Sequence, residues 1–116
     1  MSLSFKIFAN FLDLRKNNII KFFSKNECRI SILLLSVTRF EENIIKNFEF
    51  YYKNIPDDIS SKINVNTQID LAVAKGYLVK KKSNIDKRST IITASDESVD
   101  QFNMLLKNLK KNLSSH

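Results

Sequence analysis

The chain has 116 residues and a mass of 13.5 kDa, enough for one domain with a hydrophobic core and too little for two. Its 43% hydrophobic and 27% charged residues exclude a disordered chain. One glycine and one proline allow few tight turns, so long helices are expected rather than an all-β fold. The formal net charge of +7 favours a polyanionic partner, although a composition rich in Lys, Asn and Ile gives a similar excess without one.

The basic residues are unevenly distributed along the chain. Up to Ser61 there are nine basic and seven acidic residues, whereas from Lys62 onward there are ten basic and five acidic ones. Cys28 is the single cysteine, so an internal disulfide is excluded and a reducing cytoplasm is the expected compartment. The N-terminus lacks the pattern of a signal peptide, and the longest apolar run, at 32–35, is too short to span a bilayer.

The segment from Leu3 to about Phe23 has the apolar spacing of a helix, interrupted around residues 17–18. Its apolar positions include Phe5, Phe8, Leu12, Ile19 and Phe22. The sequence leaves two interpretations open: these side chains form an ordinary core, or part of the stripe packs against a second copy of the chain.

Ser24 and Glu27 have the spacing of a capping box and predict a second helix from Glu27 to about Thr38. Its buried stripe is expected at Ile30, Leu33, Leu34 and Val37. A third helix is expected from about Glu41 to Lys53, and the side chains that it should bury are Ile44, Ile45, Phe48 and Tyr52. Pro56 disfavours helix at the residue before it and marks a break.

After this break, Ser60 or Ser61 is expected to cap a helix that runs to about Lys75. The residues expected to point inward from it are Val65, Ile69, Ala72 and Val73. Gly76 fits the left-handed residue that commonly follows such a helix.

Two short β-prone segments, 77–79 and 89–93, are separated by a basic turn at 80–88, and together they predict a two-stranded wing. A last helix starts at Ser95 or Asp96. Its apolar residues form one stripe: Val99, Phe102, Leu105, Leu106, Leu109 and Leu113. This stripe must be buried, and the first helix of the same chain or of a partner chain is the expected surface.

The residues that catalysis or metal binding requires are scarce. His116 is the only histidine and Cys28 has no expected activating partner, which argues against a Cys/His metal site and a nucleophile–base pair. One glycine cannot form a Gly-rich phosphate loop. The sequence therefore predicts neither an enzyme nor a bound cofactor.

The first half of the helix at 61–75 has polar side chains of the kinds that read DNA. Amides pair with adenine, hydroxyls contact bases or phosphates, and lysine favours guanine or phosphate. The residues predicted to contact DNA from this helix are Ser61, Lys62, Asn64, Asn66, Thr67 and Gln68. An asparagine-rich protein also exposes such residues by chance, and that alternative stays open.

The turn that follows carries a denser basic cluster, which comprises Lys80, Lys81, Lys82, Lys87 and Arg88. A guanidinium fits a narrow minor groove and loses its hydration more readily than an ammonium, so Arg88 is the first candidate contact. Asp86 is expected to accept backbone N–H bonds in the turn or to orient Arg88. The alternative is a solvated, lysine-rich hairpin.

Ser61, Gly-Tyr-Leu-Val at 76–79, Asp-Lys-Arg at 86–88 and Ile-Thr-Ala-Ser at 92–95 follow one another in a recognisable order. This order resembles the winged helix-turn-helix of the multiple-antibiotic-resistance regulator (MarR) family: serine cap, recognition helix, glycine step, wing with Asp-x-Arg, and strand. In length and in its lysine-rich wing the chain is also similar to the small staphylococcal accessory regulators. Three positions depart from the family pattern, namely Ala72, Ala94 and Ser98.

The resemblance implies one mainly α-helical domain, 1–116, with a small β-hairpin. Dimerisation helices at 1–23 and 96–113 would flank a winged core at 27–95. The implied function is a homodimeric, sequence-specific DNA-binding regulator of transcription, with the recognition helix in the major groove and the wing at the minor groove or backbone. A small apolar or aromatic effector is a further expectation. The alternatives are a protein-interaction or plasmid or phage assembly module, and a non-specific nucleic-acid binder.

Overall fold

The computed structural model describes residues 18–40, 44–84 and 88–114, with side chains described as far as Lys111. The elements in chain order are α2 (Asn18–Phe23), α3 (Glu27–Val37), α4 (Phe48–Asn54), α5 (Lys62–Ala74), β1 (Leu78–Lys82), β2 (Thr90–Ala94) and α6 (Asp96–Ser114). Most of the expected first helix, together with Asp86 and Lys87, lies outside these ranges. The described part is mainly α with one antiparallel hairpin, which confirms the predicted fold class.

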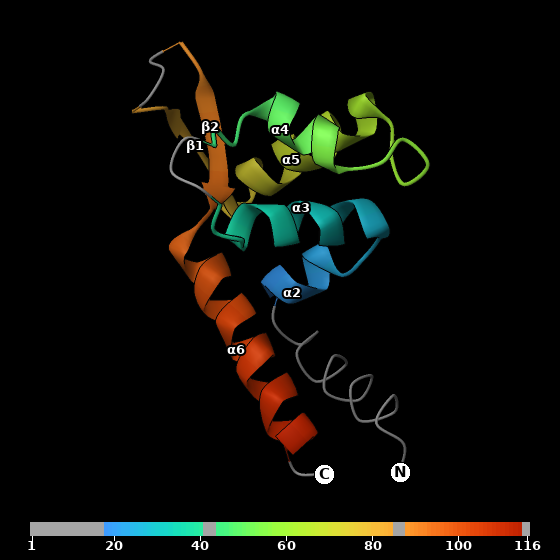
Figure 1. The fold of residues 1–116 in the computed structure, drawn as a ribbon, viewed down its shortest axis with the longest axis vertical. Helices are drawn as coiled ribbons and strands as arrows, with labels where there is room; N and C mark the ends of the chain where they lie inside the picture. Colours follow the sequence, from blue (N-terminus) through green and yellow to red (C-terminus); the bar gives the residue numbers. More distant parts are fainter. Residues whose placement is uncertain (1–17, 41–43, 85–87, 115–116) are drawn as a thin grey trace.

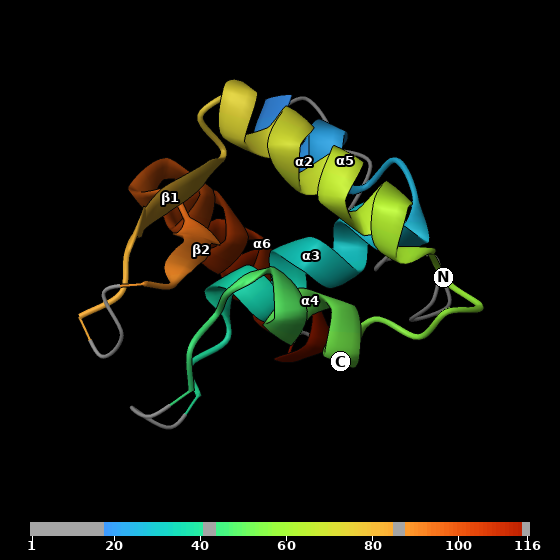
Figure 2. The same cartoon turned by 90° about the horizontal axis from the view of Figure 1, so that it is seen from above.

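The hairpin projects beside α4 and α5 at one end of the molecule, whereas α6 extends away at the other end (Figure 1). Viewed along α6, α5 and α4 lie on either side of α3, and the hairpin flanks them (Figure 2). One face of α5 and residues 80–82 of the hairpin are exposed to solvent.

The core that fixes the hairpin to the helices is made of side chains from four elements. Tyr51 of α4, Ile69 of α5, Leu78 of β1 and Ile92 of β2 are all fully buried. The Tyr51 hydroxyl donates a hydrogen bond to the carbonyl oxygen of Ile92 at 2.7 Å, and burial raises the pKa of this phenol. Tyr52, which was expected to be buried, packs against the core but is only partly buried, since α4 turns the preceding residue toward β2.

Helix α2 contributes two phenylalanines to the same core. The rings of Phe22 and Phe23 lie 5.4 and 6.3 Å from the ring of Tyr77. The ordinary-core interpretation is therefore correct for Phe22, and Phe23, which the predicted stripe did not include, is also buried. The capping prediction at Ser24 was wrong, because the chain is still turning there and the Ser24 hydroxyl donates back to Lys21. Asn26 caps α3 instead: its side-chain oxygen accepts a hydrogen bond from the backbone amide of Arg29 at 2.9 Å.

The buried surface of α3 also differs from its predicted stripe. Ile30 and Leu34 are 38% and 46% exposed, whereas Cys28, Ile32 and Ser36 are buried. Helix α3 is packed on several sides, by α2, α4, α5 and β2, so its buried surface cannot be read as one stripe.

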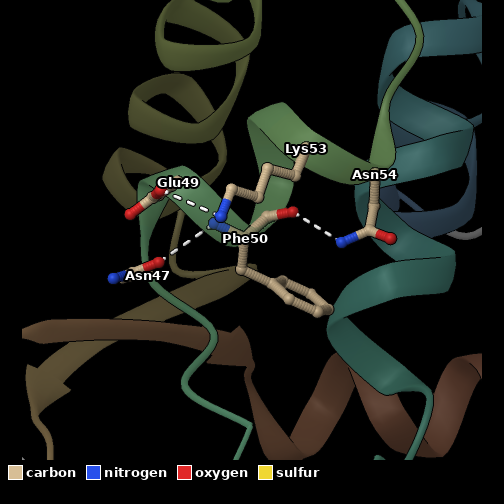
Figure 3. Close-up of polar contacts among 5 residues, drawn as sticks. All are labelled: Asn47, Glu49, Phe50, Lys53 and Asn54. Carbon is tan, nitrogen blue, oxygen red and sulfur yellow. Dashed lines mark hydrogen bonds and ion pairs between the residues drawn. The ribbon is translucent and has the colours of Figure 1, made fainter.

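The third expected helix is shorter than predicted: it starts at Phe48 instead of at about Glu41. The side chain of Asn47 accepts a hydrogen bond from the amide of Phe50 at 3.0 Å and so caps this start (Figure 3). At the other end Asn54 donates to the carbonyl of Phe50 at 2.8 Å, and Lys53 pairs with Glu49 at 3.1 Å (Figure 3).

The segment before α4 is not helical, and its backbone bonds to the hairpin. The amide of Ile92 donates to the carbonyl oxygen of Lys46 at 2.7 Å. The Lys46 ammonium donates to the carbonyls of Ser36 and Thr38 at 3.1 and 2.6 Å, and partial burial lowers its pKa. Ile44, which was expected in a buried helical stripe, is exposed in this segment.

The end of α5 agrees with its prediction. Gly76 has a φ of 79°, the left-handed conformation expected of it. Its amide donates to Val73 and the amide of Tyr77 donates to Ala72, at 3.0 and 2.9 Å, which is the double bond pattern of a Schellman cap. The buried residues of this helix were also predicted correctly, namely Val65, Ile69 and Ala72.

Strand β1 is longer than predicted and contains the three lysines that were assigned to the turn. Leu78 pairs with Ala94, Lys80 with Ile92 and Lys82 with Thr90. Because side chains alternate along a strand, Lys80 and Lys82 share the face of the buried Leu78, and Lys81 lies on the opposite face. Strand β2 starts one residue later than predicted.

Helix α6 starts at Asp96, one of the two predicted starts, and Ser95 caps it. Ser95 accepts from the amide of Ser98 at 3.2 Å, and the fully buried Ser98 hydroxyl donates to the carbonyl oxygen of Tyr77 at 2.8 Å. Through this bond to Tyr77, Ser98 has a structural role. Further along, Leu105 is buried but Leu106 is 40% exposed, so the apolar stripe is only partly covered. In the ranges described, no helix combines the length and apolarity that crossing a membrane requires.

Candidate nucleic-acid interface

The start of α5 is fixed by its own serine cap. The Ser61 hydroxyl accepts a hydrogen bond from the amide of Asn64 at 3.2 Å. This cap leaves the first turn of the helix at the surface, where Ser61 and Lys62 are exposed. The hydroxyl of Ser61 thus has a structural task besides any contact with a partner.

Four exposed residues of the first two turns form what we call the reading face: Lys62, Ile63, Asn66 and Thr67. All four are exposed, and Ile63 and Thr67, one turn apart, lie on the side of α5 that points away from its buried residues. The Thr67 hydroxyl donates to the carbonyl oxygen of Ile63 at 3.0 Å, which leaves its oxygen lone pairs toward solvent. Ile63 is 82% exposed, the largest value among the exposed large hydrophobic residues of the described chain.

Asn64 and Gln68 point to one side of α5 and form an internal chain of hydrogen bonds. The Gln68 amide nitrogen donates to Asn64 at 3.1 Å, and Asn64 donates to the Ser60 hydroxyl at 2.8 Å. The Gln68 oxygen accepts from Nε of Arg29 at 2.6 Å. These two amides are therefore held in place by hydrogen bonds within the protein.

The other side of α5 is connected to the wing. Lys80 pairs with Asp70 at 2.9 Å, and its ammonium lies 4.9 Å from the centre of the Phe48 ring. Both partners of the pair are partly exposed, so its contribution to stability is small, about 0.2–1 kcal/mol. Its effect on the site is to neutralise a carboxylate that would otherwise repel a polyanion.

The remaining wing residues that the structure describes lie near the turn of the hairpin. Lys81, Lys82 and Arg88 are exposed, and Arg88 borders a hollow of about 430 Å³ together with Asn47 and Lys80. Asp86 and Lys87 lie outside the described residues, so their predicted roles stay predictions. The hairpin that carries the wing lysines and the helix α5 thus lie at the same end of the molecule, away from the free end of α6 (Figure 1).

Three residues near this site were missed from the sequence. Ile63 is apolar but lies off the inward stripe of α5, and that mismatch was a signal of exposure. Asp70 follows the predicted contacts on the same helix, and its pairing with the wing required the fold. Arg29 reaches Gln68 across 39 residues of sequence, for which no local pattern exists.

Within the described ranges, no group of three or more His, Cys, Asp or Glu side chains is placed to hold a metal ion. A scan against protein families finds no match, and a search of curated proteins also finds none. The remaining comparison is with solved structures.

The fold is similar to that of the transcriptional regulator Tm0710 from Thermotoga maritima, with a TM-score of 0.63 and 16% identity over 93% of this chain and 70% of the other. Lactococcus lactis ZitR, in its E41A mutant, aligns over 99% of this chain and 80% of its own, with a TM-score of 0.53 and 16% identity. AbfR in a disulfide-formed state gives a TM-score of 0.53 and 18% identity over 88% of this chain, which spans 64% of AbfR. The winged-helix fold that the sequence resemblance implied is thereby confirmed.

Proposed function

We propose that the chain is a cytoplasmic, sequence-specific regulator of transcription that binds duplex DNA as a homodimer. The observation that carries the proposal is an exposed, polar reading face on the first turns of α5, together with the Asp70–Lys80 ion pair that joins the same helix to a wing of exposed basic residues. The likeness in fold to a protein described as a transcriptional regulator supports it. A helix of this size fits the major groove, and a basic ribbon fits the neighbouring backbone or minor groove.

In this proposal the reading face supplies base contacts. Asn66 can pair with adenine, Lys62 with guanine or phosphate, and the lone pairs of Thr67 can accept from a base. Ile63 can pack against the methyl group of thymine, which gives an apolar side chain at this exposed position a function.

Ser61, Asn64 and Gln68 have internal hydrogen bonds, so we assign them a share in positioning the helix as well as in contact. The wing residues Lys81, Lys82 and Arg88, with Lys80 and Lys87, would supply phosphate and minor-groove contacts, and Asp86 would order the turn. Such contacts make binding strongly dependent on salt.

The proposed dimer interface involves α6 and the first helix. Met104 and Leu106 on α6 and Leu34 on α3 are 51%, 40% and 46% exposed, and burial of such apolar area drives association. Sedimentation equilibrium should therefore give twice the mass of the chain at micromolar concentration.

A hollow of about 260 Å³ lies between α2, α3 and α6, and apolar side chains such as Phe23, Phe102 and Leu109 line it. We propose that it is where a small apolar or aromatic effector would bind. Ligand-dependent release of DNA would support this, and Phe102→Ala should abolish that response.

The test of the function is selection of bound sites from a random duplex library. A palindromic consensus with half-sites one helical turn apart is expected for the dimer. Recovery of no consensus, with affinity that depends on salt alone, would favour the non-specific binder. Retention of a partner protein with no affinity for any duplex would favour the interaction module.

The wing assignment has its own test. Arg88→Ala should weaken binding to the selected site by roughly 1–3 kcal/mol without unfolding the protein. Lys107→Ala on α6 is the matched control and should leave affinity nearly unchanged. Equal affinities of the two variants in a gel-shift titration would exclude Arg88 from the interface.

A further inference from the structure

A second basic surface lies on the side of α5 opposite the wing. Gln68, Leu71 and Lys75 recur along this side at helical spacing, and it faces α2 and the start of α3. A hollow of about 420 Å³ is formed there, and its basic residues are Lys21, Lys25, Arg29 and Lys75. We call these four residues the α2–α5 cluster.

The cluster gathers four cations around one hollow, and none of the described residues that line it is acidic. Its floor is the ring of Phe22, with the Arg29 guanidinium 4.0 Å and the Lys75 ammonium 6.0 Å from the ring centre. Like charges held together repel one another, so an anion bound among them would be favoured by all four.

Arg29 is the fixed member of the cluster. It is half-buried, and its guanidinium donates to Gln68 at 2.6 Å and to the carbonyl oxygen of Phe22 at 3.2 Å. A guanidinium has more N–H donors than these contacts use, so further donors remain for an anion. The bond to Gln68 also connects the cluster directly to the helix that carries the reading face.

The shape of the hollow favours a DNA backbone as the source of that anion. Lys21, Lys25 and Lys75 are exposed at its rim, so it is open to solvent and accessible to a large ligand. Phosphate contacts of this kind position a protein on duplex DNA without reading its sequence.

We propose that the α2–α5 cluster is a second phosphate-binding surface, which contacts the backbone of the duplex whose major groove receives α5. This inference rests on the proposed DNA-binding function. The recognition helix would then be held from both sides, by the wing on one and by the cluster on the other. The wing alone would account for only part of the dependence of affinity on salt.

The experiment compares two double variants with equal loss of charge. Lys25→Gln with Lys75→Gln removes two members of the cluster, and Lys107→Gln with Lys110→Gln removes two exposed lysines of α6. Affinity for the selected duplex is measured across a range of salt concentrations. The plot of log affinity against log salt has a negative slope, and the cluster variant should make it less steep by about 0.9 for each phosphate that is no longer neutralised. The control should keep the wild-type slope. Base preference should be unchanged in both.

Equal slopes for the two double variants, with specific binding intact, would overturn this inference and leave the proposed function standing. Wild-type protein that binds no duplex would overturn the proposed function as well. A titration with inorganic phosphate in the absence of DNA tests whether the cluster binds a free anion instead of the DNA backbone. Binding is followed by NMR at the amides of Lys25, Arg29 and Lys75. Saturable binding of free phosphate with a wild-type DNA slope in the cluster variant would assign the site to a free anion and overturn the duplex contact.

Discussion

The two sides of α3 differ in how completely a single copy of the chain buries them. On the side of α4, α5 and the hairpin, the large side chains Tyr51, Ile69 and Ile92 are fully buried and the one hydroxyl among them is hydrogen-bonded. On the side of α2 and α6, Leu34 and Leu106 stay 46% and 40% exposed beside an apolar hollow. The winged part is thus complete within one chain, whereas the α6 side has apolar surface that a second chain can cover.

The strongest test of the side of α3 that faces α4, α5 and the hairpin is Ile69→Ala. Removing this fully buried side chain from between α5 and the hairpin should lower the free energy of unfolding by about 2–5 kcal/mol. Urea unfolding followed by circular dichroism measures the loss. Leu71→Ala on the same helix is the control, because Leu71 is exposed and the change should stay within about 0.5 kcal/mol. Similar losses for both variants would contradict the described packing of α5.

A smaller effect is expected from Tyr51→Phe, which removes the buried hydroxyl and leaves the carbonyl of Ile92 without that donor. The expected loss is about 1–3 kcal/mol at neutral pH.

The same residue gives a pH dependence. Burial raises the pKa of Tyr51 in the folded state, so above the ordinary tyrosine value of about 10 the unfolded chain releases its proton first. Stability should therefore fall as pH rises past that value, and this share of the fall should be absent from Tyr51→Phe. Urea titrations of both proteins at neutral and high pH isolate it, and parallel pH profiles would argue against a buried phenol.

The junction between α5 and the wing should respond to Gly76→Ala. The left-handed backbone of Gly76 disfavours any side chain by about 1–2 kcal/mol, and no atom lies within 4 Å of the added Cβ, so the loss should come from the backbone alone. Gly76→Asn should lose less, because asparagine tolerates this conformation better. Thermal unfolding ranks the three proteins, and an alanine variant as stable as wild type would contradict the cap.

Features predicted correctly from the sequence depend on local chemistry. The Ser61 cap, the Gly76 cap and the inward residues of α5 each require only a few neighbouring residues, and all agree with the structure. The start of α4 does not, because the non-helical residues 44–46 are bonded to Ile92, which is distant in sequence. The length of β1 likewise depends on its pairing with β2, which overrides the turn character of three lysines.

The candidate site divides in the same way. Exposure of Lys62, Asn66 and Thr67 follows from the helical periodicity of α5 and was predicted. The engagement of Gln68 by Arg29 and of Asp70 by Lys80 joins different elements, so no spacing rule could reveal it. The sequence could therefore indicate which helix is the candidate for reading DNA, but not which of its polar side chains are already hydrogen-bonded within the protein.

The smallest stability effect should come from the side of α3 that faces α2 and α6, where apolar surface stays exposed. Leu105 and Leu106 are neighbours on α6, but the first is 8% exposed and the second 40%. Leu105→Ala should destabilise the chain by about 2–5 kcal/mol, as a core substitution does. Leu106→Ala should change the unfolding free energy of dilute protein by no more than about 0.5 kcal/mol, since it removes little buried area within one chain. Its effect should be on self-association, measured by sedimentation equilibrium, where the dimer should dissociate at higher concentration than in the wild type. If Leu106→Ala instead unfolds the dilute chain and leaves association unchanged, the apolar surface around Leu106 is not the surface that a second copy covers.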